Sequence, residues 1–219
     1  MCAIVGSFDR DRLIELIKLN NYRGTHSFSF STYDIKSRNL EVHVRGLGPF
    51  DYNVINIGPS QYGIAHIQAP TSDDKSISEV HPASVSEVIN NISTNTFLWH
   101  NGIIKAGYVR KLQKHYGEDT SWDTKLVLRA INRNTNEIHD LDGSFSCLWY
   151  NGIAMYFFRN DISPMFMDNE LNISSTKFLN SKPIPSGIIH YVDFDKRVLY
   201  DIGFKFKTVD NPYYFSEVT

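Results

Sequence analysis

Segments with the periodicity of β-strands occur at both ends of this chain, and segments with the periodicity of helices lie mainly between them. Apolar and polar residues alternate in 27–33 and 40–44, as they do in strands with one buried face. The expected strands are 3–8, 27–33, 40–44, 64–67, 97–99, 144–149, 153–158, 165–167, 171–174, 188–194 and 198–200. Each antiparallel sheet has one apolar face to bury, so two sheets packed face to face with helices outside would accommodate this order.

Three segments have apolar residues at helical spacing. The first is 12–19, for which Asp9 is the candidate N-cap. The other two are 107–116 and 121–131, and Ser121 is the candidate N-cap of the last helix. No repeat or linker divides the 219 residues, so the sequence predicts a single α+β domain over 1–219.

Composition excludes several classes of function. The net charge of −2 is spread without basic runs, which argues against a nucleic-acid partner and against a membrane-surface patch. No apolar stretch approaches the roughly 20 residues that span a bilayer, and Asp9 and Asp11 interrupt the region where a signal peptide needs its apolar core. We therefore expect a cytoplasmic protein in which Cys2 and Cys147 are not bridged and Cys147 belongs to the core.

The sequence also gives no sign of a metal or cofactor. The histidines do not have the spacing of ligand pairs, such as two histidines one helical turn apart. No phosphate-binding loop or dinucleotide fingerprint is present. We expect neither a metal nor a cofactor, and no place where this chain would activate an acceptor molecule.

Cys2 directly follows the initiator methionine in MCAIVGSF. Removal of Met1 would leave Cys2 with a thiol and an α-amino group, whose pKa values are about 8.5 and about 7.7 to 8.0, so that the amine could accept the thiol proton at neutral pH. The alternative is structural, because a small and partly apolar cysteine can simply begin a buried first strand.

Several separated motifs decide between these alternatives. They are CAIVG at 2–6, NYRGTHS at 21–27, AHIQAPT at 65–71, LWHNGII at 98–104, SWDTKLVL at 121–128, LDGSFSCLWY at 141–150 and FRNDISPMFM at 158–167. In this order and spacing they resemble the class II glutamine amidotransferase domain of the N-terminal-nucleophile hydrolases. The resemblance covers about 2–178, and 179–219 would form C-terminal strands and an arm.

The resemblance implies a four-layer αββα sandwich of two antiparallel sheets and a set of site residues. It implies that Cys2 attacks the side-chain amide of glutamine, giving glutamate and ammonia. Asn101 and Gly102 would supply the oxyanion donors, and Asp123 would accept the α-ammonium group of the substrate. Thr71 would contact the substrate backbone.

Three positions depart from the family pattern: Gln68 replaces an arginine that binds the α-carboxylate, Ala3 replaces a glycine, and His26 replaces an acid. A neutral amide is a weaker partner for a carboxylate than a guanidinium is. Arg23 or another cation could supply the charge, the substrate could lack a free α-carboxylate, or the domain could have drifted towards binding.

The leading hypothesis is a stand-alone glutaminase subunit that passes ammonia to a separate synthetase partner. The first alternative is a catalytically weak or inactive relative that acts as an interaction module. The second is an N-terminal-nucleophile amidase for a different amide, such as a small peptide.

Overall fold

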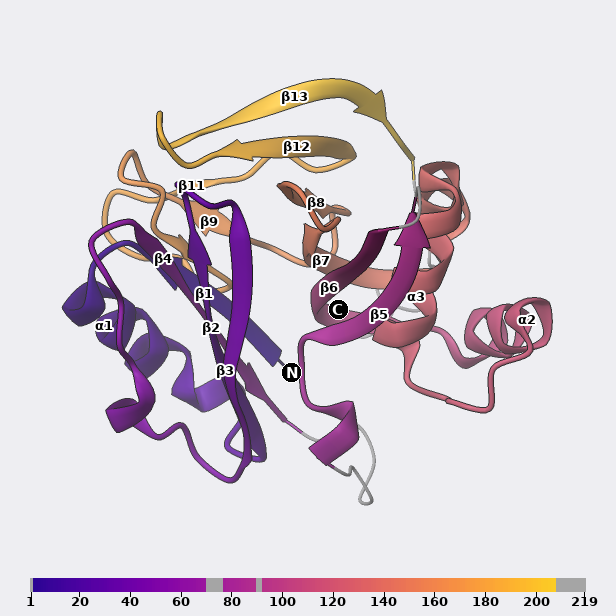
Figure 1. The fold of residues 1–219 in the computed structure, drawn as a ribbon, viewed down its shortest axis with the longest axis horizontal. Coiled ribbons are helices and arrows are strands. Elements are labelled where there is room, and N and C mark those ends of the chain that lie inside the picture. The colour runs from indigo at the N-terminus through magenta and orange to yellow at the C-terminus, as the bar shows by residue number, and fades with distance from the viewer. Residues whose placement is uncertain (1, 70–76, 90–91, 208–219) are drawn as a thin grey trace, which may run out of the picture.

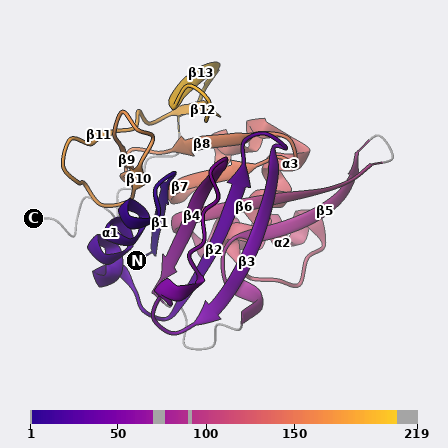
Figure 2. The same cartoon turned by 60° about the vertical axis from the view of Figure 1, so that its left-hand side comes forward.

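The computed structural model describes residues 2–69, 77–89 and 92–207, and these form four layers. Helix α1 (Arg10–Asn20) covers the outer face of one sheet, and helices α2 (Ala106–Tyr116) and α3 (Asp123–Arg133) lie outside the other (Figure 1). The view in Figure 2 shows the strands of the first sheet side by side, with the second sheet behind them. The α+β class and the αββα layering predicted from the sequence are confirmed.

The first sheet, sheet A, has seven strands in the order β11-β9-β10-β1-β4-β2-β3. Neighbouring strands pair antiparallel, and β1 lies between β10 and β4. The strands are β1 (Cys2–Ser7), β2 (Ser27–Asp34), β3 (Asn39–Leu47), β4 (Gln61–Gln68), β9 (Phe166–Met167), β10 (Ile173–Ser174) and β11 (Lys182–Pro183).

The second sheet, sheet B, has six strands in the order β13-β12-β8-β7-β6-β5, again paired antiparallel. Helix α3 packs on the outer face of β5 and β6, and α2 packs against α3. The strands are β5 (Ala83–Ile89), β6 (Ile92–Ile104), β7 (Gly143–Tyr150), β8 (Met155–Arg159), β12 (Ile188–Asp193) and β13 (Val198–Lys205).

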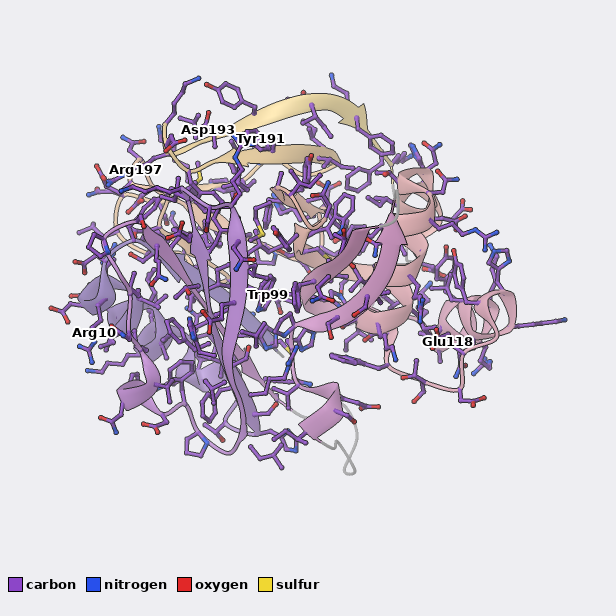
Figure 3. All side chains as sticks on the ribbon, viewed as in Figure 1. Arg10, Trp99, Glu118, Tyr191, Asp193 and Arg197 are labelled. Carbon is purple, nitrogen blue, oxygen red and sulfur yellow. The ribbon has the colours of Figure 1, made fainter. Side chains whose placement is uncertain are left out.

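Three apolar clusters lie between these four layers. Leu13, Leu16 and Ile17 of α1 pack on the outer face of sheet A, and Leu126 and Val127 of α3 belong to the cluster outside sheet B. The cluster between the sheets contains Ile4, Ile64, Trp99, Leu148 and Phe157. Trp99 is fully buried, and Figure 3 labels it between the two sheets. Because side chains alternate along a strand, the residues that share a face with Ile4 in β1, including Cys2, point into this layer.

Most of the predicted elements are present, with different ends. Asp9 is the N-cap of α1, because its carboxylate accepts a hydrogen bond from Arg12 N at 2.7 Å. The prediction that Ser121 caps the last helix is wrong: α3 begins at Asp123, and the N-cap is Trp122, without a side-chain hydrogen bond. Strand β6 extends far beyond the expected 97–99, and β5 and β11 were not expected.

Two further expectations concern cysteines and membranes. Cys2 and Cys147 are both buried and are not joined by a disulfide, and Cys147 belongs to the cluster between sheet B and α3. Within the described ranges, no helix combines the length and the apolar character needed to cross a bilayer.

Candidate active site

Cys2 lies at the first position of β1, at the end of the layer between the sheets. It pairs with Gln68 of β4, and Gln68 pairs in turn with Ser27 of β2. Only 6% of Cys2 is exposed, and that part lines a pocket of about 410 Å³. The pocket extends from Cys2 past the end of β6 to the beginnings of α2 and α3. A pocket of this size is within the range of small-molecule sites.

Gly102 lies in β6 and lines the same pocket as Cys2. Its φ is +154°, and a Cβ added there would lie 2.0 Å from the carbonyl oxygen of Ser144 in the neighbouring strand. Only glycine fits this approach of two backbones. The backbone at this point of the pocket wall is therefore fixed by its close packing against β7.

Asn101 is buried next to Gly102 and is tied to the nucleophile strand through a serine. Its Nδ2 donates to Ser175 Oγ at 3.2 Å, and Ser175 Oγ accepts a hydrogen bond from Ile4 N at 3.0 Å. Asn101 is not among the residues that line the pocket. A carboxamide nitrogen carries two N–H donors, so one of them is not used by Ser175.

Asp123 is the first residue of α3 and lines the pocket. Its Oδ2 accepts from Ile104 N at 3.1 Å and its Oδ1 from Thr124 N at 2.7 Å, which fixes the carboxylate against β6. The side chain remains 23% exposed. A carboxylate held at a helix N-terminus and open to a pocket is suited to binding an ammonium group.

Gln68 lies beside Cys2 in the sheet but does not line the pocket. Its side chain is fully buried, and its Oε1 accepts from Ser27 Oγ at 3.3 Å and lies 3.1 Å from His81 Nδ1. His81 separates Gln68 from the pocket, because His81 is a lining residue and its Nε2 lies 3.0 Å from Thr124 Oγ1. The structure thus places Gln68 behind His81, where it does not face a ligand.

Arg23 is close to Cys2, but its guanidinium is directed at the backbone and does not line the pocket. It donates to Cys2 O at 3.3 Å, to Ser175 O at 3.2 Å and to Thr176 Oγ1 at 3.0 Å. The guanidinium therefore links the beginning of β1 to the segment after β10. Thr71, the remaining predicted site residue, lies outside the described residues.

The sequence did not indicate the other charged and ring-bearing residues of the pocket. They are Glu79, His81, His100, Lys105, Arg110 and Trp122. His81 and His100 both contact Thr124 Oγ1, at 3.0 and 3.2 Å, so a buried polar network connects Gln68 to the beginning of α3. A sequence signal existed only for His100, which immediately precedes the Asn101-Gly102 pair. Among the described residues, no cluster of three or more metal-ligating side chains occurs.

Comparisons of sequence found no matching family model and no matching curated protein. Comparison of structures found the glutamine phosphoribosylpyrophosphate amidotransferase from B. subtilis, complexed with ADP and GMP, with a TM-score of 0.66 and 15% identity over 92% of this chain and 49% of that chain. A second match, the allosteric regulatory enzyme of purine biosynthesis, has a TM-score of 0.64 and 15% identity over 90% of this chain and 48% of that chain. This chain thus spans about half the length of the solved chains that it matches. The likeness confirms the predicted fold, in which two antiparallel sheets pack face to face between outer helices.

Proposed function

We propose that this chain is a glutamine amidotransferase domain that hydrolyses a side-chain amide at Cys2. The observation that carries the proposal is that Cys2, Gly102 and Asp123 line one pocket, although they come from β1, β6 and α3. A nucleophile, a fixed backbone at the predicted oxyanion position and a partner for an ammonium group are the parts that this reaction needs. The fold shared with the solved amidotransferases supports the same assignment.

In the proposed reaction, removal of Met1 exposes the α-amine of Cys2. The amine takes the proton of the thiol, directly or through a water, and the thiolate attacks the amide carbon. The C–N bond then breaks, the amine returns the proton to the nitrogen, and ammonia leaves a thioester on Cys2. Water hydrolyses the thioester to the carboxylic acid and restores the thiol.

The negative oxygen of the tetrahedral intermediate requires donors that are fixed before the reaction. We assign this role to the backbone N–H of Gly102 and to the second N–H of the Asn101 carboxamide. The first N–H of Asn101 is bonded to Ser175 Oγ, which prevents the carboxamide from rotating away. Loss of one such donor typically lowers kcat by about 10²- to 10³-fold.

The ammonia would be consumed at a second active site, and we propose a separate synthetase as the partner.

The test is the intact mass of the protein before and after incubation with 6-diazo-5-oxo-norleucine, a reactive analogue of glutamine. We expect a protein without Met1 that gains a single adduct, and ammonia release from glutamine in a coupled assay. Cys2→Ala should abolish both. Cys147→Ala is the matched control, because burial raises the pKa of the Cys147 thiol well above its usual value and keeps it unreactive.

Two results would contradict the proposal. Retained Met1 in an otherwise active protein would exclude the α-amine as the base. Processed protein that forms no adduct would show that the pocket does not accept a glutamine analogue, and would favour a different amide or a binding module.

A further inference from the structure

A glutamine-type substrate brings a carboxylate into the pocket, and the predicted partner of that carboxylate is missing. Position 68 carries a neutral glutamine whose side chain is fully buried and lies behind His81. A carboxylate taken from water needs a hydrogen-bonded or charged partner to offset its desolvation. On the basis of the proposed function, another residue must provide the partner of this carboxylate.

Arg23, the candidate that the sequence suggested, is already occupied. Its Nε, Nη1 and Nη2 donate to Thr176 Oγ1, Cys2 O and Ser175 O. Rotation of the guanidinium towards a ligand would leave two backbone carbonyls next to the nucleophile without this donor. Arg23 also does not belong to the pocket wall.

Two cations do line the pocket, Lys105 and Arg110. Lys105 Nζ forms an ion pair with Asp142 at 2.8 Å, which satisfies its charge. Arg110 is exposed, and within the described part of the chain it has no ion pair or side-chain hydrogen bond. Arg110 is therefore the pocket cation whose donors are available to a ligand.

The position of Arg110 on α2 directs it towards the reactive end of the pocket. Ala106, Val109, Arg110 and Gln113 follow the spacing of one helical face, and all four line the pocket. Side chains on a helix tilt towards its N-terminus. The N-terminus of α2 follows directly on the end of β6, which carries Gly102. The Cα–Cβ bond of Arg110 thus tilts towards the end of α2 that lies nearest to Gly102 in the chain.

The pocket also contains two acids, Glu79 and Asp123, beside the two cations. Walls with both signs of charge match a zwitterionic ligand better than a neutral or purely anionic one. We propose that Arg110 binds the carboxylate of an amino-acid amide, while Asp123 binds its ammonium group. Arg110 is then a specificity-determining residue, and the arginine absent at position 68 is replaced from a different element.

The test compares glutamine with glutaminamide, which has a neutral carboxamide in place of the α-carboxylate. Binding is measured by calorimetry in the Cys2→Ala protein, so that the result does not depend on turnover. We expect glutamine to bind more tightly than glutaminamide, and Arg110→Ala in this background to weaken glutamine binding about tenfold or more, as expected for a lost charge-assisted hydrogen bond. Glutaminamide binding should change less than about twofold, and Arg110→Lys should retain part of the preference.

Lys111→Ala is the matched control. Lys111 is the neighbouring cation on α2, but it stacks on the ring of Tyr108, 5.2 Å from the centroid, and does not line the pocket. Its removal should leave both affinities unchanged. If Lys111→Ala weakens glutamine binding as much as Arg110→Ala does, the loss reflects only the lower positive charge of α2. This result would overturn the inference.

The inference is also overturned if Arg110→Ala weakens both ligands equally, or if the Cys2→Ala protein binds neither. These results differ from a failure of the proposed function. An active protein that forms the Cys2 adduct but shows no Arg110-dependent preference refutes only the role of Arg110. A protein that binds glutamine through Arg110 but forms no adduct and releases no ammonia refutes only the hydrolysis.

Discussion

At the scale of single residues, Gly102 gives the sharpest prediction. Gly102→Ala places a methyl group 2.0 Å from Ser144 O, so the end of β6 must move. We expect kcat for amide hydrolysis to fall about 10²-fold or more, because the proposed oxyanion donor, the N–H of this residue, moves with the strand. Gly107→Ala in α2 is the control, since a Cβ there meets nothing within 4 Å. Equal kcat values for the two variants would show that Gly102 has no role in catalysis.

Gln68 gives a second prediction at this scale, and it concerns stability. Gln68→Leu removes the acceptor for Ser27 Oγ and the partner of His81 Nδ1 in a fully buried site. We expect the free energy of unfolding in urea to fall by about 1 to 3 kcal/mol. Gln68→Glu keeps the acceptor oxygens, and its stability should rise as pH falls and the buried carboxyl becomes neutral. An unchanged urea midpoint for Gln68→Leu would mean that the network does not hold His81.

Residues of the site differ in how well the sequence revealed them. Cys2, Gly102 and Asp123 were found because each lies in a short local motif that the resemblance covers. The pairing of Gln68 with His81 was not found, because it joins the end of β4 to the segment before β5 and no local motif contains both residues. Arg110 was missed because α2 carries several exposed cations, and only the packing of α2 against α3 decides which of them lines a pocket.

At the scale of elements, the end of β2 provides a pH-dependent contribution to stability. Asp34 accepts hydrogen bonds from Ser37 N at 2.8 Å, Ser60 Oγ at 2.7 Å and Ser37 Oγ at 2.9 Å. These bonds, the backbone bond from Ser37 first, lower the pKa of Asp34 to about 2. Since the folded pKa lies below the unfolded value of about 3.9, the stabilisation is complete above about pH 4 and is lost as pH falls towards 2.

Asp34→Asn tests this prediction, because asparagine keeps the shape and one acceptor but does not titrate. Urea midpoints measured between pH 2 and pH 7 should show a smaller decrease on the acid side for Asp34→Asn than for the unsubstituted protein. The difference between the two curves should narrow as pH falls towards 2, where about half of Asp34 is protonated in the folded protein. Parallel curves over the whole range would show that Asp34 has the same pKa in the folded and unfolded protein.

The sequence predicted those elements whose periodic pattern extends over many residues and whose capping residue is a close neighbour in the chain. Asp9 and α1 were recognised in this way, whereas α3 begins two residues after the expected cap because Asp123 is bound to β6 through Ile104 N. Strand β5 has a regular alternation, with Ala83 and Val85 buried and Ser84 and Ser86 exposed, and this signal was overlooked. Strand β11 is two residues long, and its pairing with β9 depends on the fold around it.

At the scale of the whole molecule, the layer between the sheets sets the geometry of the site. Cys2 belongs to sheet A and Gly102 to sheet B, so the spacing of the two sheets determines how close the proposed nucleophile lies to the proposed oxyanion donor. Trp99 fills this layer two residues before Asn101 on the same strand (Figure 3). Large side chains in a close-packed interior transmit changes in volume to their neighbours.

Trp99→Ala should therefore affect both stability and the reaction. We expect the free energy of unfolding to fall by about 3 to 5 kcal/mol, because the change leaves a cavity between the sheets. Leu16→Ala is the matched control: Leu16 is equally buried, lies between α1 and sheet A, and its removal should destabilise by about 2 to 5 kcal/mol without changing the spacing of the sheets. Under conditions where both variants are folded, the rate of adduct formation at Cys2 should fall further in Trp99→Ala than in Leu16→Ala. Equal rates would show that a cavity between the sheets does not change the geometry at Cys2. Local contacts, such as the hydrogen bond from Asn101 to Ser175, would then determine that geometry.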